Sequence, residues 1–309
     1  MPTQRQPIFI TVAGRKNVGK TYTTIKLCKK YLLGDKEKGI KGRKVLIFDT
    51  NNEKSYAKIR TINVNNFFNK KEKNYIRIFS SPKYHIDIRR IAPFNPYTGE
   101  PLSTDEMAEL LMYVMENFYG GLLIIEDIVK FVSDSIQKDI VGSLATMRHK
   151  NCDIITHFQY KKKLFNPKIY GNTDMIRIHK TNDSFYDYLT HIKGDKNLLL
   201  IAEHLVEYQN TRSKYLIEKE DGKIIYSYYC YADLLSGKIL GEYDEKVISE
   251  VLDKFISINS KTVLKELTNE INPMTGKPKY TLSEAYEIKK KQLRDEYFYW
   301  LFNLIWYMN

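Results

Sequence analysis

Residues 8–21 read Ile-Phe-Ile-Thr-Val-Ala-Gly-Arg-Lys-Asn-Val-Gly-Lys-Thr, and this stretch decides the fold. Its first six residues form a short apolar run, rich in β-formers and ending at a glycine, which predicts a buried strand. The other eight have the spacing G-x-x-x-x-G-K-T, and a helix is expected from Lys20 to about Leu33. A strand, such a loop and a helix in this order predict a phosphate-binding loop.

Each part of this loop has a chemical reason. The glycines let backbone N–H groups turn inward toward phosphate oxygens, and the helix N-terminus adds its positive dipole end. Lys20 is expected to reach the β- and γ-phosphates, and the Thr21 hydroxyl to complete the shell of a magnesium ion. The expected ligands are therefore ATP and Mg²⁺, and the expected nucleotide contacts are Gly14, Arg15, Lys16, Asn17, Val18, Gly19, Lys20, Thr21 and Tyr22.

A second acidic site is expected at residues 122–127, which read Leu-Leu-Ile-Ile-Glu-Asp. Four apolar residues followed by two carboxylates predict a buried strand with acids at its end. Glu126 is expected to hold the metal's water shell together with Thr21, and Asp127 to position or deprotonate the attacking water. The alternative is a strand that ends in a solvated acidic loop.

The rest of the first half alternates between the two kinds of element. Helices are expected at 103–118 and 128–149, and strands at 44–49, 153–159 and 175–178, with a weaker strand candidate at 75–79. Alternation of this kind, with several strands apolar throughout, predicts an α/β fold with a mostly parallel sheet between helices.

The character of the chain changes after Asp183. Residues 198–208 have helical spacing, residues 215–226 read as a hairpin around Asp221-Gly222, and helices are expected at 246–256 and 283–308. Residues 272–278 (NPMTGKP) echo residues 95–101 (NPYTGEP), which we interpret as reused turn chemistry and not as a domain repeat. We expect a P-loop ATPase domain over residues 1–235 and a helical C-terminal appendage over residues 236–309.

Composition points to an acidic partner. Forty-nine Lys and Arg against 37 Asp and Glu give a formal net charge of +12, which favours nucleic acid, although an AT-rich genome also yields many lysines. The three cysteines lie far apart, which argues against zinc and disulfides and for a reducing compartment. With a polar N-terminus and no apolar run of about 18 residues, a cytoplasmic location is expected, in the host cytoplasm or with the virion if the protein is viral.

Two families of P-loop ATPase resemble this chain. Residues 10–53 are similar to the ParA/MinD partition ATPases, but Arg15 stands at that family's signature lysine, and Lys16 and Asn17 replace two loop glycines. Residues 7–230 resemble the FtsK–HerA superfamily of DNA-translocating ATPases, which includes viral genome-packaging ATPases, Zot-like phage proteins and conjugation pumps. Phe48–Glu53, Met147–Lys150 and Thr156–Gln159 carry that resemblance beyond the loop.

The second resemblance implies a RecA-like core and further catalytic residues. Gln159 would be the sensor that contacts the γ-phosphate or its water. Arg148 would stabilise charge across a subunit boundary, which implies a homo-oligomeric ring, unless it only ends a solvated helix. The catalytic set is then Lys20, Glu126, Asp127, Gln159 and Arg148. The family usually has Asp-Glu where this chain has Glu126-Asp127.

Two further segments are candidates for binding partners. Lys161, Lys162 and Lys163 follow the sensor strand and could track DNA phosphates in a ring, or form a solvated loop. The aromatic tail, residues 297–308, could dock on the protein's own core, or anchor a portal, capsid or membrane-associated partner.

The resemblance therefore implies an ATP-driven DNA translocase or genome-packaging motor subunit. Two alternatives stay open: a ParA/MinD-like partition switch, and a Zot-like phage assembly protein whose nucleotide site is mainly structural. A small-molecule kinase is disfavoured, because no arginine-rich lid is visible.

Overall fold

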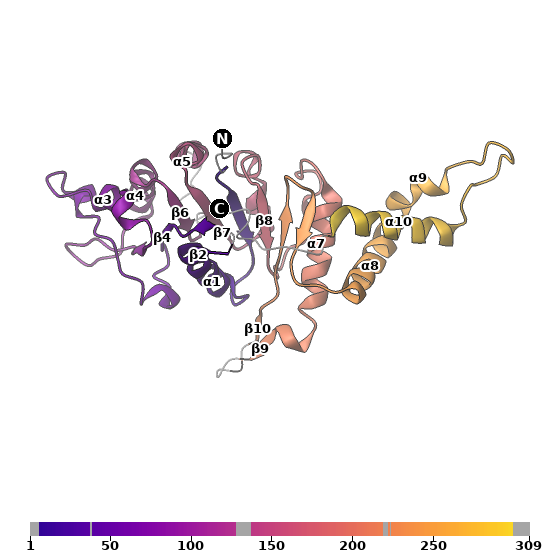
Figure 1. Cartoon of the computed structure of the whole chain (residues 1–309), viewed down its shortest axis with the longest axis horizontal. Coiled ribbons are helices and arrows are strands. Elements are labelled where there is room, and N and C mark those ends of the chain that lie inside the picture. The colour runs from indigo at the N-terminus through magenta and orange to yellow at the C-terminus, as the bar shows by residue number, and fades with distance from the viewer. Residues whose placement is uncertain (1–5, 38, 128–136, 219–221, 223, 299–309) are drawn as a thin grey trace. The chain divides into compact units, whose positions relative to one another are not determined.

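The computed structural model describes residues 6–37, 39–127, 137–218, 222 and 224–298 (Figure 1). The described residues form two compact units, which meet in the sequence between Met175 and Ile176. The sequence predicted a division near residue 235 instead. That position lies in the turn between β11 (Cys230–Asp233) and β12 (Lys238–Leu240), which are paired antiparallel, so a boundary there would separate hydrogen-bonded neighbours.

The first unit is built on a parallel sheet with the strand order β1-β7-β6-β4-β5. The strands are β1 (Phe9–Ala13), β7 (Asp153–Phe158), β6 (Gly121–Ile125), β4 (Lys44–Phe48) and β5 (Ile88–Ile91). Every residue of β1, β4, β6 and β7 is buried, which explains why these strands are largely apolar and were predicted from the sequence.

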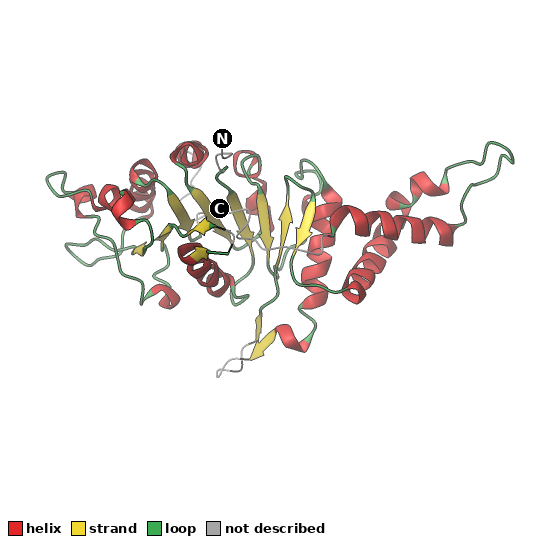
Figure 2. Ribbon diagram, viewed as in Figure 1, coloured by secondary structure: helices red, strands yellow, loops and turns green. Residues whose placement is uncertain are grey.

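Helices cover both faces of this sheet (Figures 1 and 2). The chain moves across the sheet in one direction through α1 (Lys20–Leu33), from β1 to β4. It returns in the other direction through α4 (Thr104–Asn117) and α5 (Gln137–Met147). Because parallel crossovers are right-handed, the two directions place α1 on one face and α4 and α5 on the other. The fold class expected from the sequence is confirmed.

Residues 75–79, predicted as a weak strand, form the helix α3 (Tyr75–Ser80) instead. Asn74 caps this helix by accepting a hydrogen bond from the Arg77 amide, and Ile76 and Phe79 pack inward at helical spacing. The real edge strand is β5, whose sequence Ile-Arg-Arg-Ile gave no strand signal because half of it is charged.

The remaining elements of the first unit are short. They are the strands β2 (Gly34–Asp35) and β3 (Ile40–Lys41), the helices α2 (Asn65–Phe68) and α6 (Pro167–Tyr170), and 3₁₀ turns that include η1 (Lys54–Tyr56), η2 (Pro82–Tyr84), η4 (Arg148–Lys150) and η5 (Lys161–Phe165). The first part of the helix predicted at 128–149 lies outside the described residues.

The second unit centres on α7 (Lys196–Gln209), most of whose residues are buried. The predicted hairpin is confirmed as β9 (Leu216–Glu218) and β10 (Ile224–Tyr226), and the helix predicted at 246–256 as α8 (Glu245–Val263). The helix predicted at 283–308 is present as α10 (Leu282–Tyr297), which ends at Tyr297, and residues 299–308 lie outside the described part of the chain. Its other elements are β8 (Met175–Ile178), η6 (Phe185–Tyr188), η7 (Ser213–Tyr215) and α9 (Lys265–Thr268). Of the aromatic tail, only Tyr297 and Phe298 are described, and both are buried.

The two N-P-x-T-G-x-P stretches adopt the same turn, as predicted. Asn95 accepts from the amide of Gly99, and Asn272 accepts from the amide of Gly276, at 2.8 and 2.9 Å. Both glycines have a positive φ, 72° and 65°, which this turn requires. The third residue of each turn, Tyr97 or Met274, is exposed.

Candidate functional site

The loop of residues 14–19 joins β1 to α1 and is shaped by two residues in the left-handed region. Asn17 has φ 61° and Gly19 has φ 74°. The amide of Gly14 donates to the carbonyl of Phe158, 3.1 Å away, which ties the loop to β7. The N-cap residue of α1 is Gly19, which has no side chain to cap the helix, and the positive end of a helix dipole favours an anion at this position.

The lysine of the loop bonds to its own backbone. Lys20 Nζ donates to the carbonyl oxygens of Gly14 and, at 2.8 Å, of Arg15. The ammonium group therefore lies over the concave side of the loop, where a phosphate would sit. Thr21 follows in the first helical turn and is partly exposed, whereas Tyr22 is 61% exposed, with Lys26 Nζ 4.6 Å from the centre of its ring.

Four functional positions follow directly after parallel strands. Gly14 follows β1, Gln159 follows β7, Glu126 follows β6 and Asp49 follows β4. Since the carboxyl ends of parallel strands meet at one edge of a sheet, all four lie at the same edge. β7 lies between β1 and β6, so Gln159 stands between the phosphate loop and the two acids. The predicted loop, acids and sensor are thus brought together.

Glu126 is held in a buried network that the sequence did not predict. Its Oε1 accepts from the Tyr56 hydroxyl, and its Oε2 lies 2.7 Å from Nδ1 of His157. The other ring nitrogen of His157 lies 3.0 Å from the Thr24 hydroxyl on α1. Burial opposes ionisation of Glu126, but His157, Tyr56 and Lys20 hold its pKa below the ordinary value. Glu126 therefore remains a buried carboxylate.

Asp127 is held by Gln159. The side-chain amide of Gln159 donates to Asp127 Oδ2 at 2.8 Å. Asp127 itself has φ 44°, an uncommon conformation for a residue other than glycine. Next to them, Asp49 accepts from Arg90 at 3.1 Å, and burial raises the pKa of Asp49.

Arg148 lies at the opposite end of the parallel strands, where β1 begins. It forms an ion pair with Asp174 at 2.8 Å and donates to the carbonyl of Asn172. Asp174 also accepts from the amide of Phe9, the first residue of β1. The length of β1, roughly 15 Å at about 3.3 Å per residue, therefore separates Arg148 from the phosphate loop of its own chain. The structure does not bring Arg148 to that site.

The three consecutive lysines do not form a free loop. Lys161 is only 3% exposed and begins the turn η5, whereas Lys162 and Lys163 are exposed. A buried first lysine reduces the charge that this segment can offer to DNA.

The residues that sequence reasoning missed are Tyr56, His157 and Thr24. Because side chains alternate along a strand, His157 shares a face of β7 with Gln159, two residues later. That spacing was a usable signal for His157. No comparable signal existed for Tyr56, which contacts Glu126 from the segment between β4 and β5.

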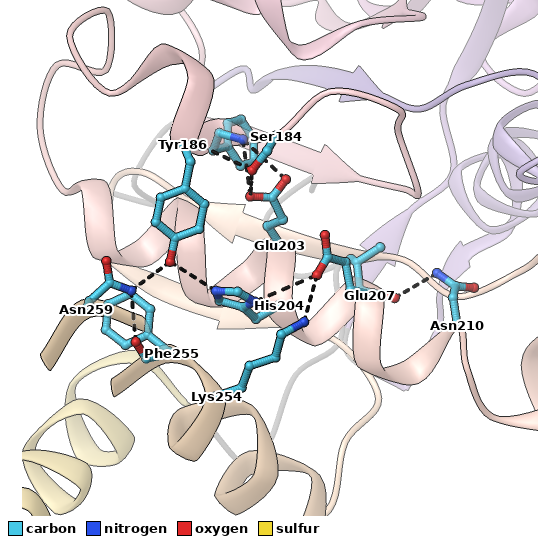
Figure 3. A network of polar contacts seen from close by, with 11 residues as sticks. Ser184, Tyr186, Glu203, His204, Glu207, Asn210, Lys254, Phe255 and Asn259 are labelled. Carbon is cyan, nitrogen blue, oxygen red and sulfur yellow. Dashed lines mark hydrogen bonds and ion pairs between the residues drawn. The ribbon is translucent and has the colours of Figure 1, made fainter. Parts of the chain in front are cut away.

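A second polar cluster lies within the second unit (Figure 3). The Tyr186 hydroxyl lies 3.1 Å from Nε2 of His204 and accepts from Asn259 at 2.7 Å. Glu203 accepts from the Ser184 hydroxyl at 2.8 Å, and Glu207 forms an ion pair with Lys254 at 3.1 Å. These contacts join η6, α7 and α8, which gives the cluster a structural role. Among the described residues, no group of three or more His, Cys, Asp or Glu side chains could hold a metal ion.

A G-x-x-x-x-G-K-T loop after the first strand of a parallel sheet, with acids and a polar residue after two neighbouring strands, defines the P-loop class of protein. The chain has the RecA-like P-loop NTPase fold, as the sequence predicted. No family model matches the chain, and no curated protein matches it. Among the described residues, no helix has both the length and the apolar character needed to cross a bilayer.

Solved structures do resemble it. The chain is similar to the genome packaging NTPase B204 from Sulfolobus turreted icosahedral virus 2, at 17% identity and a TM-score of 0.44, over 77% of this chain and 99% of that one. It is also similar to the N-terminal domain of zonular occludens toxin from Neisseria meningitidis, at 18% identity and a TM-score of 0.32, over 57% of this chain and 78% of that one. VirB4 of Thermoanaerobacter pseudethanolicus is similar at 10% identity and a TM-score of 0.44, over 77% of this chain and 90% of that one.

These structures share less than 20% identity with the chain, and their TM-scores lie below 0.5. The similarity says nothing about activity, so function must be judged from the site itself.

Proposed function

We propose that this protein is a magnesium-dependent ATPase and a subunit of an ATP-driven DNA motor of the genome-packaging kind. The observation that carries the ATPase is the placement of Gln159 between the phosphate loop and the acids Glu126 and Asp127, at one edge of the sheet. A loop that only bound a phosphate would need neither a second acid nor a polar residue between them.

The residues at this edge suit magnesium. The Thr21 hydroxyl and the carboxylates of Glu126 and Asp127 are hard oxygen donors, which Mg²⁺ prefers. Both oxygens of Glu126 already take part in contacts with Tyr56 and His157, but each keeps a further lone pair for a metal-bound water. Thr21 and Glu126 would hold the ion, which when bound would neutralise the charge that develops on the phosphates.

Hydrolysis at this site would be an in-line displacement. A water oxygen attacks the γ-phosphorus, the bond to the β–γ bridging oxygen breaks, and a proton of the water passes to Asp127. Gln159 holds Asp127 and its water in line. Lys20 exchanges the carbonyl oxygens of Gly14 and Arg15 for phosphate oxygens, where its charge stabilises the leaving group.

Arg148 can contribute only to another copy's nucleotide, because it lies at the far edge of its own sheet. With a side chain that is 34% exposed, it is accessible to a neighbouring subunit. This position supports a homo-oligomeric ring in which each subunit completes the site of the next.

The distribution of charge supports a nucleic-acid partner. Residues 1–175 hold 30 of the 49 Lys and Arg but only 17 of the 37 Asp and Glu, a net charge of +13, whereas residues 176–309 carry −1. A codon bias toward lysine would enrich both halves alike. The concentration of charge in the ATPase unit favours attraction of a polyanion to that unit.

The test is ATP hydrolysis by the purified protein with and without DNA, for the wild type, Lys20→Ala and Arg148→Ala. DNA-stimulated turnover that both substitutions abolish would support the motor. Turnover that is indifferent to DNA and to Arg148→Ala would leave a partition-type switch. Full biological function in Lys20→Ala would leave an assembly protein with a structural nucleotide site.

A further inference from the structure

We propose that residues 54–61 contact the phosphate backbone of nucleic acid and transmit the state of the nucleotide site to the nucleic acid. These residues comprise η1 and the five residues after it, and we term them the η1 turn. This inference rests on the proposed function, since it assumes both ATP and DNA as ligands. It names the surface that meets DNA and the residue, Tyr56, that connects this surface to Glu126.

The η1 turn is basic and accessible. Its sequence is Lys-Ser-Tyr-Ala-Lys-Ile-Arg-Thr, with three cations and no acid. Lys54, Lys58 and Arg60 are all exposed, and none of the three forms an ion pair with another residue of the part that the structure describes. Three uncompensated cations within seven residues suit a row of phosphates, and they carry no information about base sequence.

One hydrogen bond connects this surface to the catalytic acid: the Tyr56 hydroxyl donates to the carboxylate of Glu126. Beside it, Thr50, which precedes the turn, donates its hydroxyl to the backbone carbonyl of Glu126 at 2.9 Å. Tyr56 is completely buried, so its ring fixes the turn against the edge of the sheet. A movement of Glu126 on binding or losing the nucleotide would therefore displace the turn directly.

The far end of the turn is fixed to the edge strand. The amide of Arg90 donates to the carbonyl of Arg60 at 3.1 Å, and the amide of Ile62 donates to the carbonyl of Arg90 at 2.8 Å. Arg90 in turn forms an ion pair with Asp49 at 3.1 Å. The turn is thus held at both ends by residues at or beside the nucleotide site, which allows it to transmit a displacement.

A second basic segment of the same unit lacks this connection. Lys70, Lys71 and Lys73 lie in an exposed stretch for which no bond to the acids or to the phosphate loop exists in the described structure. The η1 turn is where free cations and a direct bond to Glu126 coincide. By linkage, a surface coupled in this way must bind DNA with an affinity that depends on the bound nucleotide.

The experiment measures the affinity of the full chain for a fluorescent DNA duplex, by anisotropy, over a range of salt concentrations and with and without a non-hydrolysable ATP analogue. For Lys54→Ser/Lys58→Ser/Arg60→Ser, we expect binding to weaken more than about tenfold. The slope of log affinity against log salt should fall by about 1 for each phosphate that the variant no longer neutralises. The matched control, Lys70→Ser/Lys71→Ser/Lys73→Ser, removes the same charge from exposed sites of the same connection and should retain most of the affinity.

Tyr56→Phe tests the coupling separately. It keeps all three cations but removes the bond to Glu126, so duplex affinity without nucleotide should stay within about twofold, while the difference made by the ATP analogue should disappear. Equal losses in the two triple variants would overturn the assignment of the surface. An unchanged nucleotide effect in Tyr56→Phe would overturn the coupling. A wild-type protein that binds no duplex would instead refute the DNA motor itself.

Discussion

Gln159 donates its side-chain amide to Asp127 across 2.8 Å and so joins the ends of β7 and β6. The bond matters because Asp127 sits in the left-handed region, at φ 44°, where a residue other than glycine is seldom found without support. A strained acid held by a polar neighbour, beside a phosphate loop, is positioned to orient a water molecule. Substitutions at this pair separate the charge of Asp127 from its position.

Asp127→Asn removes the charge of the proposed base while keeping a side chain that tolerates a positive φ. We expect kcat for ATP hydrolysis to fall about 10²- to 10⁴-fold, with little change in nucleotide affinity, because proton transfer is lost and binding is not. Steady-state kinetics and binding of a fluorescent ATP analogue measure the two quantities.

Gln159→Ala is the matched variant for position, since it leaves the charge of Asp127 in place. It should lower kcat less than Asp127→Asn and again spare nucleotide affinity. Asp127→Gly relieves the backbone strain and removes the carboxylate, so it should be as inactive as Asp127→Asn. Normal turnover in Asp127→Asn would exclude Asp127 as the base.

His157→Phe should destabilise the first unit by about 2 kcal/mol, because it leaves one oxygen of the buried Glu126 carboxylate without a partner. His157→Gln keeps a donor and should lose less. Unfolding in urea measures both variants. If the contact with Glu126 is the cause, adding Glu126→Gln to His157→Phe will recover part of the loss, since a neutral amide is less costly to bury than a carboxylate. Strictly additive losses would show that the two residues do not interact.

Arg148 has two roles that can be separated, the ion pair with Asp174 and the proposed contribution to a neighbouring site. If it acts across a subunit boundary, Arg148→Ala should reduce turnover about 10³-fold or more. Asp174→Asn, which breaks the same ion pair, should leave turnover largely intact.

Mixing provides a second readout. Subunits with Lys20→Ala and subunits with Arg148→Ala are each inactive alone, but a mixed ring contains some interfaces with both residues intact. Partial recovery of ATPase activity on mixing would support action across the boundary. Equal losses in Arg148→Ala and Asp174→Asn, with no recovery on mixing, would assign Arg148 a structural role only.

The sequence predicted what depends on local pattern. Apolar strands, the loop around Lys20 and the acids after β6 are all readable within a few residues, and the strands and helices they predict are where the structure has them. It failed where long-range contacts decide. Residues 75–79 have strand-like composition, but packing of Ile76 and Phe79 makes them a helix, and β5 is a strand only because β4 pairs with it. The contact between Tyr56 and Glu126 spans 70 residues of sequence, and no spacing rule could have found it.

The second unit should lose stability in acid through Glu207. His204 and then Lys254 lower the pKa of this carboxyl to about 2, against the opposing effect of partial burial. A carboxyl whose pKa is lower in the folded state stabilises the fold above its ordinary pKa of about 4.5, and that contribution disappears as pH falls toward 2.

Glu207→Gln should therefore melt at a lower temperature than the wild type at pH 7, by a small margin because the side chain is half exposed. Near pH 2 the two proteins should melt at the same temperature. Thermal melts at pH 7, 4.5, 3 and 2 measure this convergence. Lys254→Met removes the second partner and keeps Glu207. Its melting temperature should also lie below that of the wild type at pH 7, by a smaller difference than for Glu207→Gln, and this difference should shrink as pH falls. A gap between Glu207→Gln and the wild type that stays constant from pH 7 to pH 2 would mean that the charge of Glu207 does not contribute to the stability of the fold.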